Sequence, residues 1–209
     1  MGEEQWGARE ERSSIKAVGK LMMSWERGGG LSLLLCMDVK GGYENVGVGK
    51  MVERLRGLGV EEYLRKWVSS FLRERRVKVR VGKRMGDWVK LKGGTIQGSP
   101  LSPMLFMFLL GGVLEEVRKE EVEGMEVVVV VDDVDFMVVG RWEEDILRKV
   151  GWMEKGLERG LRKWEVDVQV LKLEGMWMDK ESKRRDRRVR WLGCKISREE
   201  EVRVLGLWW

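Results

Sequence analysis

Residues 127–139 read VVVVVDDVDFMVV, and this stretch decides both the fold class and the candidate site. Two valine-rich apolar runs, residues 127–131 and 136–139, flank an acidic turn and are typical of buried strands. The stretch therefore predicts a hairpin that carries Asp132 and Asp133 at its tip. Adjacent carboxylates repel one another, and a bound divalent cation would remove that repulsion. An Asp-rich turn without a ligand is the alternative interpretation, because Asp favours turns.

A second acidic position follows another buried strand. Residues 31–37 read LSLLLCM, an apolar run that ends at Asp38. If the two strand ends converge, their carboxylates could hold two Mg²⁺ ions about 3.5–4 Å apart, the arrangement used for in-line phosphoryl transfer. Carboxylate oxygens are ligands that Mg²⁺ prefers. The chain has no His and only two Cys, which argues against a zinc site or a His-based mechanism.

The remaining periodicities indicate that helices and strands intermix along the chain. Helices are expected at 60–72, after Pro103 and at 142–164, although three glycines weaken the last one. Strands are expected at 77–81, 88–91, 166–170, 175–178 and 189–196. Because the sheet is mostly built from hairpins, the predicted fold class is α+β, with an antiparallel sheet packed on helices.

The length and charge of the chain set broad limits on its function. Its 209 residues fit one domain. The net charge of +5, with many Lys and Arg at 73–92, favours a polyanionic partner, although a solvated basic face would give the same signal. Two cysteines give no disulfide framework, which favours a reducing, intracellular location, nuclear or cytoplasmic. No signal peptide is recognised at residues 1–12, and the longest apolar run, 104–114, is too short to cross a membrane.

Amino-acid usage is biased against residues whose codons need cytosine. Ala, Pro, Thr, Gln and His are scarce or absent, whereas Gly, Val, Arg, Glu, Met and Trp abound. We interpret this bias as mutational decay of a repetitive element, with general base bias as the alternative.

Six short segments follow one another along about the whole chain. They comprise residues 5–14 (QWGAREERSS), 37–46 (MDVKGGYENV), 94–103 (GTIQGSPLSP), 130–133 (VVDD), 172–174 (KLE) and 190–193 (RWLG). In this order they resemble motifs of reverse transcriptases from retrotransposons that lack long terminal repeats. The resemblance implies a polymerase palm with partial fingers and the start of a thumb. It divides the chain into a fingers remnant at 1–30, a palm at 31–180, and a primer-grip hairpin with the start of the thumb at 181–209.

The same resemblance implies an activity and the residues that carry it. The reaction is RNA-directed DNA synthesis on an RNA template, in which the 3′-hydroxyl of a DNA primer attacks a deoxynucleoside triphosphate with the aid of two Mg²⁺ ions. The positions that match the family's metal-binding carboxylates are Asp38, Asp132 and Asp133. Those that match its nucleotide contacts are Tyr43, as a steric filter for the sugar, Gln97, Gly98 and Lys172. Without the resemblance, the last four would be interpreted as a core aromatic, a helix-capping loop and a solvated lysine.

The chain also departs from the family pattern. Val130 stands where the family has the Tyr of Y-x-D-D, and Ile96 stands where it has a Pro. These changes leave a second interpretation open, in which the chain is a catalytically inactive, mutationally decayed remnant that at most binds nucleic acid.

Overall fold

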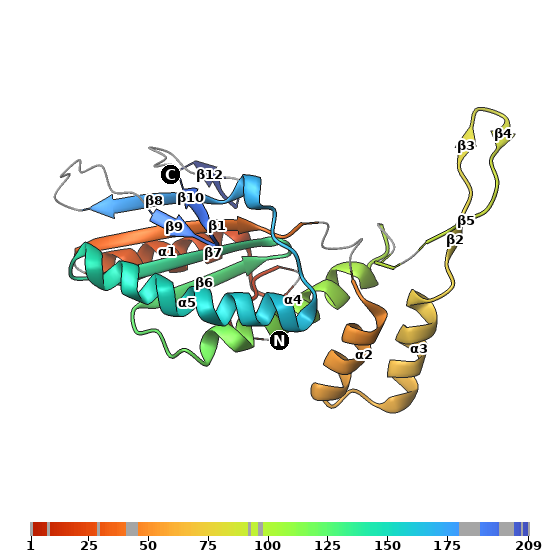
Figure 1. Cartoon of the computed structure of the whole chain (residues 1–209), viewed down its shortest axis with the longest axis horizontal. Helices are drawn as coiled ribbons and strands as arrows, with labels where there is room; N and C mark the ends of the chain where they lie inside the picture. The colour runs from red at the N-terminus through yellow and green to blue at the C-terminus, as the bar shows by residue number, and fades with distance from the viewer. Residues whose placement is uncertain are drawn as a thin grey trace.

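The computed structural model describes residues 2–7, 9–28, 30–40, 46–91, 93–95, 98–179, 189–196, 203–205 and 207–208. At its centre is a four-stranded antiparallel sheet in the order β6-β7-β1-β8. The strands are β1 (Leu31–Asp38), β6 (Met125–Val130), β7 (Asp133–Gly140) and β8 (Glu174–Asp179). Helices lie on the sheet, and a helical pair with a long hairpin extends from one end of it (Figure 1).

Strand β1 lies inside the sheet and pairs on both sides, with β7 and with β8. Every residue of β1 before Asp38 is buried, as the continuous apolar run predicts. Side chains of a strand alternate between the two faces of the sheet. Leu33 and Leu35 therefore join the larger core, whereas Leu34 and Cys36 join a smaller core on the other face.

Helices α4 (Leu101–Arg118) and α5 (Glu143–Trp164) form the larger core with one face of the sheet. Two glycines of α5 allow the helices to approach closely. A β-carbon on Gly156 would lie 2.8 Å from the carbonyl oxygen of Glu116, and one on Gly160 would lie 2.7 Å from that of Val113. Two of the three glycines that weaken α5 as an isolated helix, Gly156 and Gly160, are thus required where it packs on α4.

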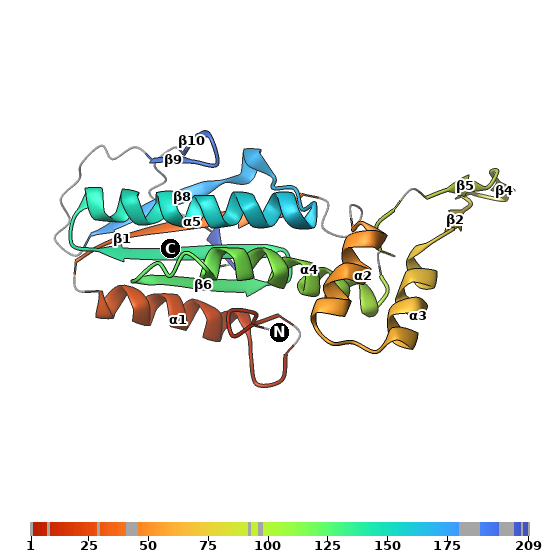
Figure 2. The same cartoon turned by 60° about the horizontal axis from the view of Figure 1, so that its bottom comes forward.

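Helix α1 (Ser14–Arg27) covers the opposite face of the sheet from α5 (Figure 2). It begins after Ser13, whose hydroxyl accepts a hydrogen bond from the backbone N–H of Lys16. Ahead of α1, the chain runs beside β6. The N–H of Trp6 donates to the carbonyl of Val129 at 2.7 Å, and the N–H of Val129 donates to the carbonyl of Glu4 at 2.8 Å.

Helices α2 (Val48–Gly57) and α3 (Glu62–Leu72) form a pair that lies beside α4 (Figure 1). Arg54 joins α2 to α4. Its guanidinium donates two hydrogen bonds of 2.6 Å to the Glu115 carboxylate and one of 2.8 Å to the carbonyl of Phe108. After α3 comes a hairpin built from two short ladders, β2 (Arg76–Val77) with β5 (Val89–Lys90), and β3 (Arg80–Val81) with β4 (Arg84–Met85).

Shorter elements follow β8. Strands β9 (Val189–Trp191) and β10 (Cys194–Ile196) form one hairpin, and β11 (Arg203–Val204) pairs with β12 (Leu207–Trp208). The Trp191 ring contacts Phe136 edge to face, with 5.9 Å between ring centroids. In the described ranges, no helix combines the length and apolar character needed to span a lipid bilayer.

The predicted α+β class, with an antiparallel sheet packed on helices, is confirmed. The predicted hairpin at 127–139 and helices at 60–72 and 142–164 correspond to β6–β7, α3 and α5. The strand expected at 166–170 is wrong. Val168 forms only an isolated bridge with Val39, and the 3₁₀ helix η1 (Val170–Lys172) follows it.

Candidate active site

Asp38 and Asp133 face each other at the edge of the sheet where β1 ends and β7 begins. They are direct partners in the antiparallel ladder, so both side chains leave the sheet on the same face. Like charges placed directly opposite each other destabilise a sheet. The two strands therefore hold together a pair of carboxylates that a bound cation would stabilise.

A strained turn presents Asp132 next to this pair. Val131 has φ +63°, a left-handed conformation that is rare for a β-branched residue. The N–H of Val39 donates to the carbonyl of Asp132 at 3.3 Å, which ties the turn to the residue after Asp38. The carbonyl of Asp38 accepts a hydrogen bond of 2.9 Å from the N–H of Gln169. Backbone contacts thus fix the turn and the strand end against each other.

The acidic pair is electrostatically strained and in contact with a lysine. Asp133 is exposed as a residue, yet loss of solvent around its carboxylate raises its pKa, and the charges of Asp132 and Asp38 raise it further. Lys172 donates a hydrogen bond through Nζ to Oδ2 of Asp38. That contact raises the pKa of Lys172. The ammonium of Lys172 in turn opposes part of the increase in the pKa of Asp133, which stays raised.

A cavity of about 590 Å³ opens beside the pair and is lined by further acidic groups, Asp135 and Glu174. Both are ladder partners of Cys36, so the three side chains form one row across β7, β1 and β8. Asp135 is 3% exposed, and the Oδ2 atom has no hydrogen-bond partner among the described residues. Burial raises the pKa of Asp135 to about 7, against a hydrogen bond from the Cys36 thiol that lowers it.

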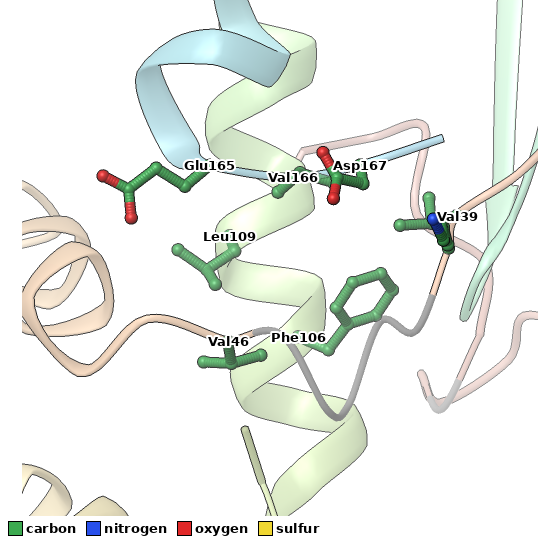
Figure 3. A pocket seen from close by; sticks show the side chains of 8 residues that line it. Val39, Val46, Phe106, Leu109, Glu165, Val166 and Asp167 are labelled. Atoms are coloured by element: carbon green, nitrogen blue, oxygen red, sulfur yellow. The ribbon is translucent and has the colours of Figure 1, made fainter. Parts of the chain in front are cut away.

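A smaller hollow lies on the other face of the sheet, beside the end of β1 (Figure 3). The side chain of Val39 borders it, together with Val46, Phe106 and Leu109. The carboxylate of Asp167 lies at its rim, while the carbonyl of this residue accepts a hydrogen bond of 2.8 Å from the N–H of Lys40. Because the labelled side chains that surround the hollow are mostly apolar, we assign it to packing between β1, α4 and the segment after α5.

The acidic pair fits a hard divalent cation in its chemistry. Across the described ranges, no three Asp, Glu or Cys side chains converge closely enough to hold a metal ion as they stand. Mg²⁺, however, commonly keeps several waters and binds through one or two carboxylates together with substrate phosphates. The facing carboxylates of Asp38 and Asp133 meet that smaller requirement.

The predicted site residues fall into three groups. Asp38, Asp132, Asp133 and Lys172 meet at one edge of the sheet. Gly98 lies ahead of α4 with φ +91°, a conformation that favours glycine. The other two, Tyr43 and Gln97, lie outside the described residues.

The acidic cavity is also lined by Asp135 and Glu174, to which the sequence motifs assign no role. A signal for Asp135 was present in the sequence. Positions two apart in a strand share a face, so Asp135 follows Asp133 on the same side of β7. Glu174 directly precedes the strand predicted at 175–178. This position alone does not indicate that the strand pairs with β1, so the sequence did not place Glu174 beside the site.

Comparisons with known proteins identify the family and the fold of the chain. The sequence model of the family described as "Reverse transcriptase (RNA-dependent DNA polymerase)" matches residues 1–207. Two relatives are retrovirus-related Pol polyproteins from the type-1 retrotransposable element R2. The one from Nasonia vitripennis is 26% identical over 131 residues, which are 60% of this chain and 13% of the polyprotein. The one from Popillia japonica is 22% identical over 88 residues, which are 42% of this chain and 14% of the polyprotein. The chain is therefore similar to a small part of each.

Solved structures of telomerase from Candida tropicalis share the fold. Apo telomerase truncated from its C-terminal domain has a TM-score of 0.62 at 15% identity, covering 98% of this chain and 40% of that chain. Telomerase in complex with a TWJ fragment of telomeric RNA has a TM-score of 0.66 at 14% identity, covering 91% of this chain and 32% of that chain. At these identities the similarity concerns the fold.

Proposed function

The chain belongs to the reverse transcriptase (RNA-dependent DNA polymerase) family, and we propose that it forms the polymerase core of a retrotransposon without long terminal repeats. The proposed activity is RNA-directed DNA synthesis. Its partners would be an RNA template, a DNA primer and deoxynucleoside triphosphates. The observation that carries the proposal is the direct pairing of Asp38 with Asp133 beside an acidic turn.

In this proposal, Asp38, Asp132 and Asp133 hold two Mg²⁺ ions. Bound Mg²⁺ would supply stabilisation of the negative charge on the attacking and leaving oxygens of phosphoryl transfer. The raised pKa of Asp133 supports the assignment, because mutual repulsion of carboxylates favours cation binding.

We also assign a role in nucleotide binding to Lys172. It contacts Asp38 and is 62% exposed in its side chain, so it is free to turn towards an incoming triphosphate once a cation neutralises the carboxylate. Gln97 and Gly98 would line the nucleotide and template pocket, and Tyr43 would exclude a sugar 2′-hydroxyl. The domain layout, with fingers at 1–30, palm at 31–180 and thumb start after 181, belongs to the same proposal.

Primer extension on an RNA template tests the activity. The purified chain is compared with Asp38→Asn and Asp133→Asn in Mg²⁺, with Glu158→Gln on the exposed side of α5 as the matched charge-neutralised control. Each Asn variant should lose roughly 100-fold or more, because phosphoryl transfer depends on positioning at the ångström level. Extension that survives in Asp133→Asn would refute the assigned role.

A second candidate function is nucleic-acid binding without catalysis. It is favoured by Val130, which packs against the smaller core where the family pattern has an aromatic. Weak primer extension by the parent chain that increases in Val130→Tyr would indicate a damaged enzyme. Oligonucleotide binding without extension, in both the parent chain and Val130→Tyr, would favour a non-catalytic remnant.

A further inference from the structure

The hairpin after α3 carries the basic character of the whole chain. Residues 73–91 contain eight Lys or Arg and two Asp or Glu, a net charge of +6, whereas the chain as a whole is +5. The rest of the chain therefore sums to −1. The ion pairs between described residues all lie outside this segment. A concentrated positive charge that far exceeds the neighbouring acidic residues, and that forms no ion pair among the described residues, fits a polyanion.

The same hairpin extends away from the body of the chain (Figures 1 and 2). It follows α3, and the helical pair and the hairpin lie beyond the end of the sheet where β1 stops and β7 starts, which is the end that carries the acidic pair. Its two ladders pair only two residues each. An isolated two-stranded hairpin is marginally stable in water, so contact with a partner would add to its stability.

Apolar side chains on the hairpin are exposed rather than packed. Val79, Val81, Met85, Trp88 and Val89 are each more than half exposed. Trp88 is 62% exposed, and Nζ of Lys78 lies 4.7 Å from the centroid of its ring. A cation held against an exposed aromatic ring places a phosphate-binding group next to a surface on which a base can stack.

We propose that residues 73–91 form a docking surface for single-stranded nucleic acid, with Trp88 stacking on a base and the surrounding Lys and Arg contacting phosphates. A duplex would satisfy the cations but would leave the exposed apolar side chains without base faces to contact. The surface extends the proposed function, since a polymerase must hold a template strand. It does not require catalysis, and it stands if the metal site is inactive.

Binding is measured by fluorescence anisotropy of a labelled oligouridylate of about 20 nucleotides, longer than the site of most single-strand binding folds. EDTA is present and nucleotides are absent, so that the result is independent of polymerisation. Trp88→Ala should weaken binding roughly 5- to 100-fold, and Trp88→Phe should retain most of it. Trp152→Ala is the matched control, because Trp152 is also exposed and lies beneath a cation, with the Arg148 guanidinium 5.5 Å from its ring centroid.

Charge reversal tests the phosphate contacts separately. The double variant Lys83→Glu, Arg84→Glu at the hairpin tip should make the slope of log affinity against log salt less negative by about 1.4, the value for two phosphate contacts to a single strand. Circular dichroism checks that each variant keeps the fold. Three results would each overturn the proposal. The first is an equal loss of binding in Trp88→Ala and Trp152→Ala. The second is duplex binding as tight and as dependent on Trp88 as single-strand binding, and the third is adsorption to anionic vesicles without oligonucleotide binding.

Discussion

Gly7 lies against the backbone of Val131, the residue that begins the acidic turn. A β-carbon on Gly7 would lie 2.9 Å from the amide nitrogen of Val131 and 3.0 Å from its Cγ2. Val131 is itself in the left-handed region, so the turn depends on its surroundings to keep this conformation. Residues 4–6, which hydrogen-bond to Val129, hold the N-terminal segment in place behind the turn. The motif at residues 5–14 therefore packs against the turn that carries Asp132 and Asp133.

Gly7→Ala should destabilise the protein by about 1–3 kcal/mol, since the added methyl forces the turn or the N-terminal segment to move. The measurement is the free energy of unfolding in urea. Gly19→Ala is the matched control. Gly19 lies within α1, and a β-carbon there meets nothing within 4 Å, so alanine should stabilise by about 0.5–1 kcal/mol. Equal effects of the two substitutions would contradict a close contact at Gly7.

Arg54→Lys tests the link between α2 and α4. Lysine keeps the charge but cannot reproduce the two parallel hydrogen bonds to Glu115 together with the one to the Phe108 carbonyl. Arg54 is 7% exposed, so lost hydrogen bonds are not replaced by water, and we expect a loss of about 1–3 kcal/mol in the free energy of unfolding. Lys66→Met, in an exposed pair with Glu62, should change it little. An Arg54→Lys variant as stable as the parent chain would show that the bidentate geometry is unimportant.

Glu116→Gln tests a buried carboxylate that joins α4 to α5. Lys119 and Lys163 each donate to Glu116 at 2.8 Å, Arg159 donates at 3.3 Å, and hydrogen bonds from these groups lower the Glu116 pKa from 4.5 to about 2. A lowered pKa in the folded state stabilises the fold above pH 4.5, and this contribution disappears as the pH falls to about 2.

The Glu116→Gln variant should therefore be less stable than the parent chain by about 1–3 kcal/mol at neutral pH, with the three cations only half-buried and partly screened. Urea unfolding at neutral pH and at several acidic values measures the difference, which should shrink between pH 4.5 and pH 2. A difference that stays constant over that range would rule out ionisation of Glu116 as its source.

Local patterns in the sequence predicted the elements whose burial follows from their own residues. The apolar run before Asp38 and the valines on either side of Asp132 and Asp133 predicted strands, and these are β1, β6 and β7. The glycines of α5 weakened the prediction of that helix, because the role of Gly156 and Gly160 depends on contact with α4, which no local pattern contains. The strand expected at 166–170 is wrong because its pairing with the end of β1 is confined to a single bridge, Val168 with Val39, and this pairing depends on a segment far away in the sequence.

The candidate site was predictable to a similar degree. Two strand-end carboxylates indicated a cation site, but their register was not encoded in either segment alone. The resemblance to reverse transcriptases indicated Lys172 as a site residue. Its contact with Asp38, however, depends on η1, a turn that the sequence pattern did not predict. The support of the acidic turn by Gly7 joins residues 124 positions apart and could not be derived from spacing.

Lys172 and a divalent cation should compete for Asp38. In the structure the ammonium of Lys172 contacts the carboxylate, so a cation must displace it or share Oδ2 with it. Lys172→Met removes this competitor and should tighten binding of Mg²⁺ by about 2- to 5-fold, a modest factor because the pair is partly exposed. Titration calorimetry with Mg²⁺ measures the affinity. Lys155→Met, which removes an exposed charge from α5, is the control for the general loss of positive charge.

If Lys172 also contacts the triphosphate, Lys172→Met should extend primers more slowly although it binds Mg²⁺ more tightly. Weaker Mg²⁺ binding in Lys172→Met than in Lys155→Met would show that the lysine supports the cation site instead of competing with it.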